Sequence, residues 1–128
     1  MIEGYVLDAS ALLCLLNEET GSARVEAALD AALISSVNYS EVVAKIVDRG
    51  GSAELATAIL DPLHLHIVEF DRLQAIHAGA LRAATRAAGL SFGDRACLSL
   101  AASRHLKVLT TDRAWVQLSL DLHIEVLR

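Results

Sequence analysis

Cysteine is scarce in this chain of 128 residues, and its two cysteines do not form the sites that cysteine usually builds. Cys14 and Cys97 lie in apolar stretches of helical spacing, with no CxxC pair and no histidine placed to complete a zinc site. We interpret both as reduced thiols in the core. Long apolar runs are absent too, since the longest, residues 9–16, is too short to cross a membrane and no basic segment precedes it. A soluble, cytoplasmic protein is therefore expected.

Positive charge is also in short supply, with 11 Lys and Arg against 16 Asp and Glu and a formal net charge of −5. Binding to a nucleic-acid backbone usually requires clustered Lys and Arg. If four of the 16 acids belong to a metal site, however, 12 remain against the 11 bases, and the bound ion neutralises the site itself. Net charge therefore neither favours nor excludes a nucleic-acid substrate.

Short apolar runs alternate with longer stretches of helical spacing, which is typical of an α/β domain with a parallel sheet. The short runs predict five strands, at residues 4–7, 33–36, 66–69, 107–110 and 124–127. The stretches between them predict six helices, at residues 9–17, 22–31, 39–49, 53–60, 72–88 and 92–104. Because there is no internal repeat and no linker, we expect one domain, residues 1–128, with a central parallel five-stranded sheet flanked by helices.

Four acidic residues fall where such a fold collects its functional groups. Asp8 and Asp112 follow the first and fourth predicted strands, Glu41 is expected in the first turn of the helix after the second strand, and Asp94 opens the helix after Gly89. Ligands of open parallel α/β sheets bind outside the carboxyl ends of the strands. Two close carboxylates repel by about 4 kcal/mol at an effective dielectric constant of 20, and a divalent cation removes that cost. An all-oxygen ligand set favours Mg²⁺ or Mn²⁺ over zinc.

Each acid taken alone also has a structural explanation. The segments 91–94 and 38–41 both fit a capping box, in which the acid at the third helical position satisfies free backbone N–H groups. Asp8 and Asp112 fit simple N-caps at strand-to-helix turns. Only the constellation of all four acids favours a metal site over helix capping.

Four short segments carry a more specific pattern. They are, in chain order, Val6-Leu7-Asp8-Ala9-Ser10-Ala11, Ser36-Val37-Asn38-Tyr39-Ser40-Glu41-Val42, Leu90-Ser91-Phe92-Gly93-Asp94-Arg95-Ala96-Cys97-Leu98 and Val108-Leu109-Thr110-Thr111-Asp112. Together they resemble the PIN-domain nucleases, and most of all the VapC toxins of bacterial toxin–antitoxin pairs. The resemblance spans nearly the whole chain, and the Ser-x-Gly-Asp-Arg segment at residues 91–95 is its most specific part.

This resemblance implies a PIN-like fold and a Mg²⁺- or Mn²⁺-dependent endoribonuclease that leaves a 5′-phosphate and a 3′-hydroxyl. Its catalytic residues and metal ligands, direct or through water, would be four: Asp8, Glu41, Asp94 and Asp112. The secondary polar contacts would come from Ser10 and from Thr110 or Thr111. The implied partners are an RNA substrate and a small antitoxin protein. The chemistry would be metal-assisted phosphodiester hydrolysis with one or two ions.

Arg95 is the basic residue nearest the proposed site. It could hold a substrate phosphate or pair with Asp94 or a neighbouring acid, and the sequence leaves both open. Arg82 and Arg86, one helical turn apart, could likewise extend a basic face or form a solvated surface.

The hydrophobic fraction of 54% exceeds the usual ~45–50%, which predicts apolar surface for a partner. We expect a homodimer with a hydrophobic groove that is lined by the first helices and receives the antitoxin. The expected lining residues are Leu12, Leu13, Leu16, Val42, Val43 and Ile46.

Other functions are compatible with the same scaffold. A PIN domain in RNA maturation would share these residues, and the neighbouring gene would separate it from a toxin. A non-catalytic binding or regulatory module of the phospho-receiver type would have paired acids on the first strand and a lysine after the last, but the chain ends Val126-Leu127-Arg128. A phosphatase with an aspartyl nucleophile would have a second Asp at position 10, where this chain has Ser10.

Overall fold

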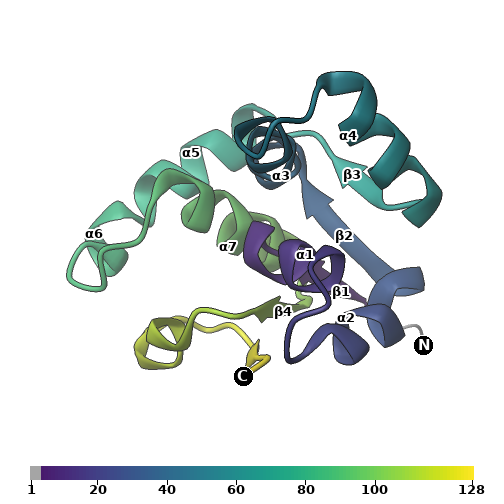
Figure 1. Ribbon diagram of the computed structural model, residues 1–128. Coiled ribbons are helices and arrows are strands. Elements are labelled where there is room, and N and C mark those ends of the chain that lie inside the picture. The colour runs from purple at the N-terminus through teal and green to yellow at the C-terminus, as the bar shows by residue number, and fades with distance from the viewer. Residues whose placement is uncertain (1–3) are drawn as a thin grey trace.

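The computed structural model describes residues 4–128, and its centre is a five-stranded parallel sheet (Figure 1). The strands are β1 (Tyr5–Leu7), β2 (Ala32–Ser35), β3 (His66–Val68), β4 (Lys107–Thr110) and β5 (Ile124–Val126). They lie in the order β3-β2-β1-β4-β5, and every neighbouring pair is parallel. Each predicted strand agrees with the observed one to within a residue at either end. The predicted α/β class with a central parallel sheet is confirmed.

Seven α-helices and three short 3₁₀ helices connect the described strands. The α-helices are α1 (Ala9–Leu16), α2 (Ser22–Ala28), α3 (Ser36–Asp48), α4 (Ala53–Leu60), α5 (Arg72–Ala80), α6 (Arg82–Thr85) and α7 (Phe92–Arg104). The 3₁₀ helices are η1 (Leu29–Ala31), η2 (Asp61–Leu63) and η3 (Arg113–Gln117). The last turn of the helix predicted at 22–31 thus tightens into η1. Figure 1 shows α5 and α6 extending to the left, away from the sheet.

The chain order places a topological switch at β1. From β1 the chain moves outward through β2 to β3 and then crosses back to β4 on the other side of β1. In open parallel sheets ligands bind at such a switch, so we expect a ligand crevice between the loops after β1 and β4 at the carboxyl ends. Asp8 and Asp112 lie in these two loops.

The helix predicted at residues 72–88 is wrong in its length. It divides at Leu81 into α5 and the four-residue α6, and residues after Thr85 form turns. Gly79 lies beside the break, and glycine lowers helix stability by about 1 kcal/mol relative to alanine. The hydroxyl of Thr85 also donates to the Leu81 carbonyl at 2.8 Å, inside the short second helix.

The predicted start of the third helix is also wrong. Helix α3 begins at Ser36, three residues earlier than expected, because the hydroxyl of Ser35 accepts a hydrogen bond from the backbone N–H of Val37 and caps the helix directly after β2. Glu41 is therefore in the second turn and not in the first. The capping box expected between Asn38 and Glu41 does not form, which frees both side chains for other contacts.

The core lies on both faces of the sheet. Val6 and Val108 pack on one face with α7 and Trp115, whereas Leu7 and Leu109 pack on the other with α1 and α2. Cys14 and Cys97 are buried and free, as predicted. None of the helices formed by residues 4–128 is long and apolar enough to cross a membrane.

A further part of the core joins α1, α3 and α4 to β2. Leu12 and Val42 are fully buried there with Ile34 and Leu60. The prediction that Leu12 and Val42 line an open groove is therefore wrong, because both side chains turn inward onto β2.

Candidate active site

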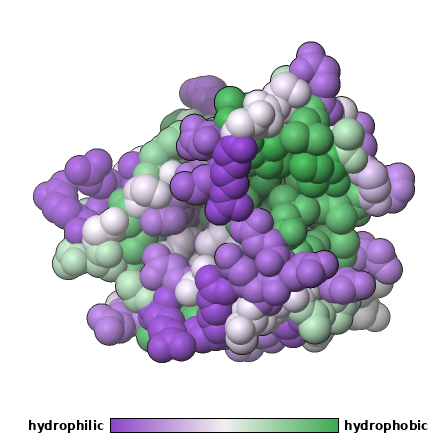
Figure 2. Space-filling view, in the orientation of Figure 1, coloured by the Kyte–Doolittle hydropathy of each residue, from purple (hydrophilic) through white to green (hydrophobic). Residues whose placement is uncertain are grey.

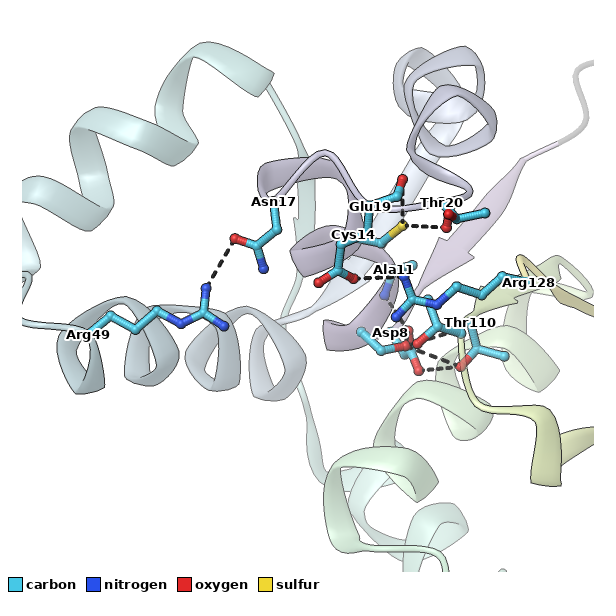
Figure 3. A network of polar contacts seen from close by, with 11 residues as sticks. Asp8, Ala11, Cys14, Asn17, Glu19, Thr20, Arg49, Thr110 and Arg128 are labelled. Atoms are coloured by element: carbon cyan, nitrogen blue, oxygen red, sulfur yellow. Dashed lines mark hydrogen bonds and ion pairs between the residues drawn. The ribbon is translucent and has the colours of Figure 1, made fainter.

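Asp8 occupies the turn between β1 and α1, where its carboxylate is almost fully enclosed. It is 4% exposed and caps α1 by accepting a hydrogen bond from the Ala11 N–H at 2.8 Å (Figure 3). The hydroxyl of Ser10 donates to the same oxygen at 2.7 Å. The other oxygen accepts from the Thr110 hydroxyl at 2.6 Å. The predicted N-cap is present, and the carboxylate accepts two hydroxyl hydrogen bonds in addition to the capping bond.

Burial raises the pKa of Asp8 from its ordinary 3.8 to about 6. The hydrogen bonds from Thr110, Ser10 and Ala11 oppose this rise, and the negative charge of Asp94 adds to it. Above pH 6 the protein therefore keeps an ionised carboxylate in a poorly solvated place beside a second acid. A bound cation would relieve both penalties.

Two hydroxyl groups connect the loop after β1 to the loop after β4. The Thr110 oxygen, besides donating to Asp8, accepts a hydrogen bond from the Asp112 N–H at 3.1 Å. The Ser10 oxygen accepts from the Thr111 N–H at 3.0 Å. Of the two threonines that the sequence left open, Thr110 is the one whose side chain contacts the acid, while Thr111 contributes its backbone.

Asp112 lies at the edge of this network and is exposed. Its carboxylate caps η3 by accepting from the Ala114 N–H at 3.0 Å, so the predicted N-cap is present. The backbone of Asp112 is fixed by Thr110, which ties its position to that of Asp8.

Asp94 approaches from α7, where the predicted capping box with Ser91 is complete. One Asp94 oxygen accepts from the Ser91 N–H at 2.9 Å, and the Asp94 N–H donates to the Ser91 hydroxyl at 3.2 Å. The box fixes the orientation of the carboxylate through one oxygen, while no described side chain donates to the other. Capping and site formation are therefore compatible at this residue.

Glu41 approaches from α3 and is exposed to solvent. One of its oxygens accepts a hydrogen bond from the side-chain amide of Asn38 at 2.9 Å. The same amide donates to the carbonyl of Gly93 on α7 at 3.0 Å. Glu41 is thereby held against the first turn of α7, next to Asp94.

The buried thiol of Cys97 lies in the electrostatic environment of three of these acids. Burial raises its pKa well above the usual value, and the negative charges of Asp8, Asp94 and Glu41 raise it further. All three carboxylates thus lie within electrostatic range of one buried atom, one helical turn behind Asp94. As the side chains stand, no three His, Cys, Asp or Glu residues in the described part of the chain are close enough together to hold a metal ion. A metal site formed by these acids therefore stays a prediction.

Arg95 has a different environment from either of the two expected. Its Nη1 donates to the Ala78 carbonyl of α5 at 3.0 Å, and its guanidinium lies 6.0 Å from the centre of the Phe92 ring. It forms no ion pair with Asp94 or another acid of residues 4–128. This contact favours a role in holding α5 against α7, and substrate binding by Arg95 stays a prediction.

Sequence reasoning missed Asn38 and Gly93 as parts of the site. Asn38 is 1% exposed, and its contact with Gly93 joins residues 55 positions apart in the chain. The available signal was local: an Asn one helical turn before Glu41, and a Gly immediately before Asp94 at the start of a helix.

Residues 5–119 match the PIN domain family, and the chain therefore belongs to that family. The resemblance inferred from the four segments is confirmed. No curated protein matches the chain.

Several solved structures share the fold, and three of them are named as VapBC proteins. DNA-bound VapBC from Salmonella typhimurium is 23% identical, with a TM-score of 0.74 over 99% of this chain and 100% of that one. VapBC2 from Rickettsia felis, bound to a promoter DNA fragment, is 17% identical, with a TM-score of 0.75 over 97% and 98% of the two chains. VapBC-5 from Mycobacterium tuberculosis is 22% identical, with a TM-score of 0.66 over 99% of both chains. At these identities the likeness is one of fold.

Proposed function

We propose that the protein is a Mg²⁺- or Mn²⁺-dependent endoribonuclease that acts as the toxin of a toxin–antitoxin pair. The observation that carries the proposal is the buried Asp8 carboxylate at the carboxyl end of β1, which Ser10 and Thr110 tie to the loop that bears Asp112. Membership in the PIN domain family and a fold shared with VapBC complexes support it.

The donor chemistry of the crevice fits a hard divalent cation. All four acids offer oxygen only, which Mg²⁺ and Mn²⁺ prefer. Asp94 and Asp112 each use one oxygen for helix capping and keep the other available. Glu41 and Asp112 are exposed, so rotation of these two side chains could complete a ligand set that the described conformation leaves open. When bound, the ion would activate water and neutralise charge on the phosphate.

The acidic residues have different proposed roles in the site. Asp8 forms the buried base of the crevice, and its orientation is fixed by Ser10 and Thr110. The two exposed acids, Glu41 and Asp112, lie on the solvent side, where an RNA phosphate would enter. These contacts allow the acids to keep their places before substrate arrives, which lowers the cost of organising the site.

Cleavage of RNA should require a divalent ion. Purified protein free of antitoxin is expected to cut a mixed RNA substrate with MgCl₂ or MnCl₂ and to stop when EDTA is added in excess, as read on a denaturing gel. Restoration by fresh Mn²⁺ is the control against irreversible unfolding. Cutting that continues unchanged in EDTA would refute metal dependence, and RNA binding without cutting would favour a non-catalytic module.

The antitoxin partner is assigned to an apolar groove between α1, α3 and α4. This groove has a volume of about 460 Å³, and its apolar lining comprises Leu13, Leu16, Ile46, Leu55 and Ile59. Figure 2 shows hydrophobic side chains gathered beside α3 and α4. Lys45 and Arg49 lie at its rim, with Arg49 bound to Asn17 (Figure 3). We propose that an apolar antitoxin segment with acidic flanks binds here.

The predicted homodimer is a separate proposal, which sedimentation of the purified chain would test.

A charge inside the groove should separate antitoxin binding from catalysis. Ile46→Asp is expected to weaken antitoxin binding by at least about 100-fold, because an unpaired buried charge costs several kcal/mol, while RNA cleavage is retained. Val47→Asp is the matched control, since Val47 is the next residue of α3, is 47% exposed and does not line the groove. Co-purification with the product of the adjacent gene measures the effect. Equal binding by Ile46→Asp and wild type would exclude this groove.

A further inference from the structure

Asn38 makes two hydrogen bonds with one side-chain nitrogen, and they join the two helices that carry Glu41 and Asp94. The nitrogen donates one proton to the Glu41 carboxylate and the other to the Gly93 carbonyl. The opposite amide orientation would place an oxygen against two acceptors, so the chemistry of the neighbours fixes the assignment. The amide oxygen of Asn38 is buried and has no hydrogen-bond partner among the described residues.

Gly93 leaves the space that the Glu41 carboxylate occupies. A methyl group built on Gly93 would lie 2.6 Å from the Cδ atom of Glu41 and closer still to its oxygens. Any other residue at position 93 would therefore displace the carboxylate. The backbone of Gly93 is ordinary helix, so the requirement for glycine comes from this close approach and not from its φ angle.

We propose that Asn38 and Gly93 are positioning residues that form a seat for the Glu41 carboxylate, here called the Glu41 seat, and hold it in the metal-binding crevice. The inference rests on the proposed function. Joining α3 to α7 would need only the bond to Gly93. The second proton of Asn38 instead restrains an exposed glutamate, which loses rotamer freedom and gains no burial. Such a restraint is expected where a carboxylate is preorganised to bind a metal ion.

The test measures Mn²⁺ affinity by calorimetric titration and, separately, the melting temperature in EDTA. Asn38→Leu is expected to weaken Mn²⁺ binding about 10- to 100-fold, the usual effect of losing a residue that orients a metal ligand, and to lower the melting temperature. Gly93→Ala should weaken Mn²⁺ binding comparably but leave the melting temperature equal or higher, because alanine favours the helix and the displaced Glu41 side chain can move into solvent. A purely structural role would not produce that split.

Gln74→Leu is the matched control. Gln74 also has a buried side-chain amide on α5, whose nitrogen donates to the Glu69 carbonyl and whose oxygen lacks a partner among the described residues. Unlike Asn38, its side chain donates to no carboxylate. This variant should melt lower and bind Mn²⁺ as wild type does. In a Glu41→Gln background, Asn38→Leu should cause little further loss of affinity, since the two changes act on one group.

Three outcomes contradict the proposal. Wild-type Mn²⁺ affinity in both Asn38→Leu and Gly93→Ala would overturn the Glu41 seat alone. Loss of affinity that adds fully to that of Glu41→Gln would assign Asn38 a structural role. Absence of Mn²⁺ binding by wild type would instead overturn the proposed function, and the seat with it.

Discussion

Asp8→Asn is expected to lower the rate of RNA cleavage by more than about 100-fold while leaving the far-ultraviolet circular-dichroism spectrum unchanged. Replacing a residue that only orients a metal ligand already lowers metal affinity or activity 10- to 100-fold. Asp8 is proposed as a ligand itself, so its replacement should have a larger effect. Asparagine keeps the oxygen that accepts from Ala11 and Ser10, so the cap of α1 should survive. A fixed-time cleavage assay at saturating Mn²⁺ measures the loss.

The control for this variant is Asp71→Asn. Asp71 is the N-cap of α5, accepts from the Gln74 N–H at 2.9 Å and is exposed, so it shares the capping role of Asp8 without its burial. Its replacement should leave cleavage at the wild-type rate. Wild-type cleavage by Asp8→Asn would remove Asp8 from the catalytic site.

The second large effect is on stability without metal. In EDTA at pH 8, Asp8→Asn should melt above wild type by about 9–15 °C. A pKa raised from 3.8 to about 6 means that the ionised carboxylate destabilises the folded state by about 3 kcal/mol above pH 6, and a chain of this size gains roughly 3–5 °C per kcal/mol. Differential scanning calorimetry of the two proteins measures the difference.

The stability difference between Asp8→Asn and wild type should depend on pH, and its sign follows from the raised pKa of Asp8. Because the folded state binds the Asp8 proton more tightly than the unfolded state, the contribution of Asp8 to the free energy of unfolding falls as pH rises from about 4 to about 6. The advantage of Asp8→Asn should therefore be full above pH 6 and vanish near pH 4. Magnesium at ~100 times its dissociation constant would restore about 2.7 kcal/mol to wild type and less to the variant. If Asp8→Asn melts lower than wild type at every pH, capping dominates over burial and the strained-carboxylate account of Asp8 is wrong.

Asp94 is a weaker probe of this electrostatic strain than Asp8. Its carboxylate completes a capping box at the start of α7, and the loss of a charge at a helix N-terminus costs about 0.3–1 kcal/mol, which opposes any relief of repulsion. Helix capping and metal binding were competing explanations from sequence. The structure shows that Asp8, Asp94 and Asp112 do cap helices, and capping directs their carboxylates from fixed places.

The features predicted correctly are those set by nearby residues. Short apolar runs located the strands, Asp8 and Asp112 form the predicted N-caps, and the Ser91–Asp94 spacing gave the capping box. The start of α3 was missed because Ser35, still inside the strand, supplies the cap. The break at Leu81 was missed because alanine-rich helical spacing continues through it.

What the sequence could not give depends on contacts between distant segments. The Glu41 seat joins residue 38 to residue 93. No local sequence pattern at either position predicts contact with the other. The groove was predicted from α1 and α3, but its outer wall comes from Leu55 and Ile59 of α4. Only the packing of α4 beside α3 shows that these exposed side chains complete it.

The central claim is that the acids at the carboxyl end of the sheet bind a divalent ion, and a crystal soaked in MnCl₂ tests it most directly. The expected result is an anomalous peak in the crevice, in contact with Asp8 and at least one of Asp94, Glu41 and Asp112, with metal–oxygen distances of about 2.0–2.3 Å. A soaked crystal with no peak among these acids, or with manganese bound only elsewhere on the surface, would contradict the account.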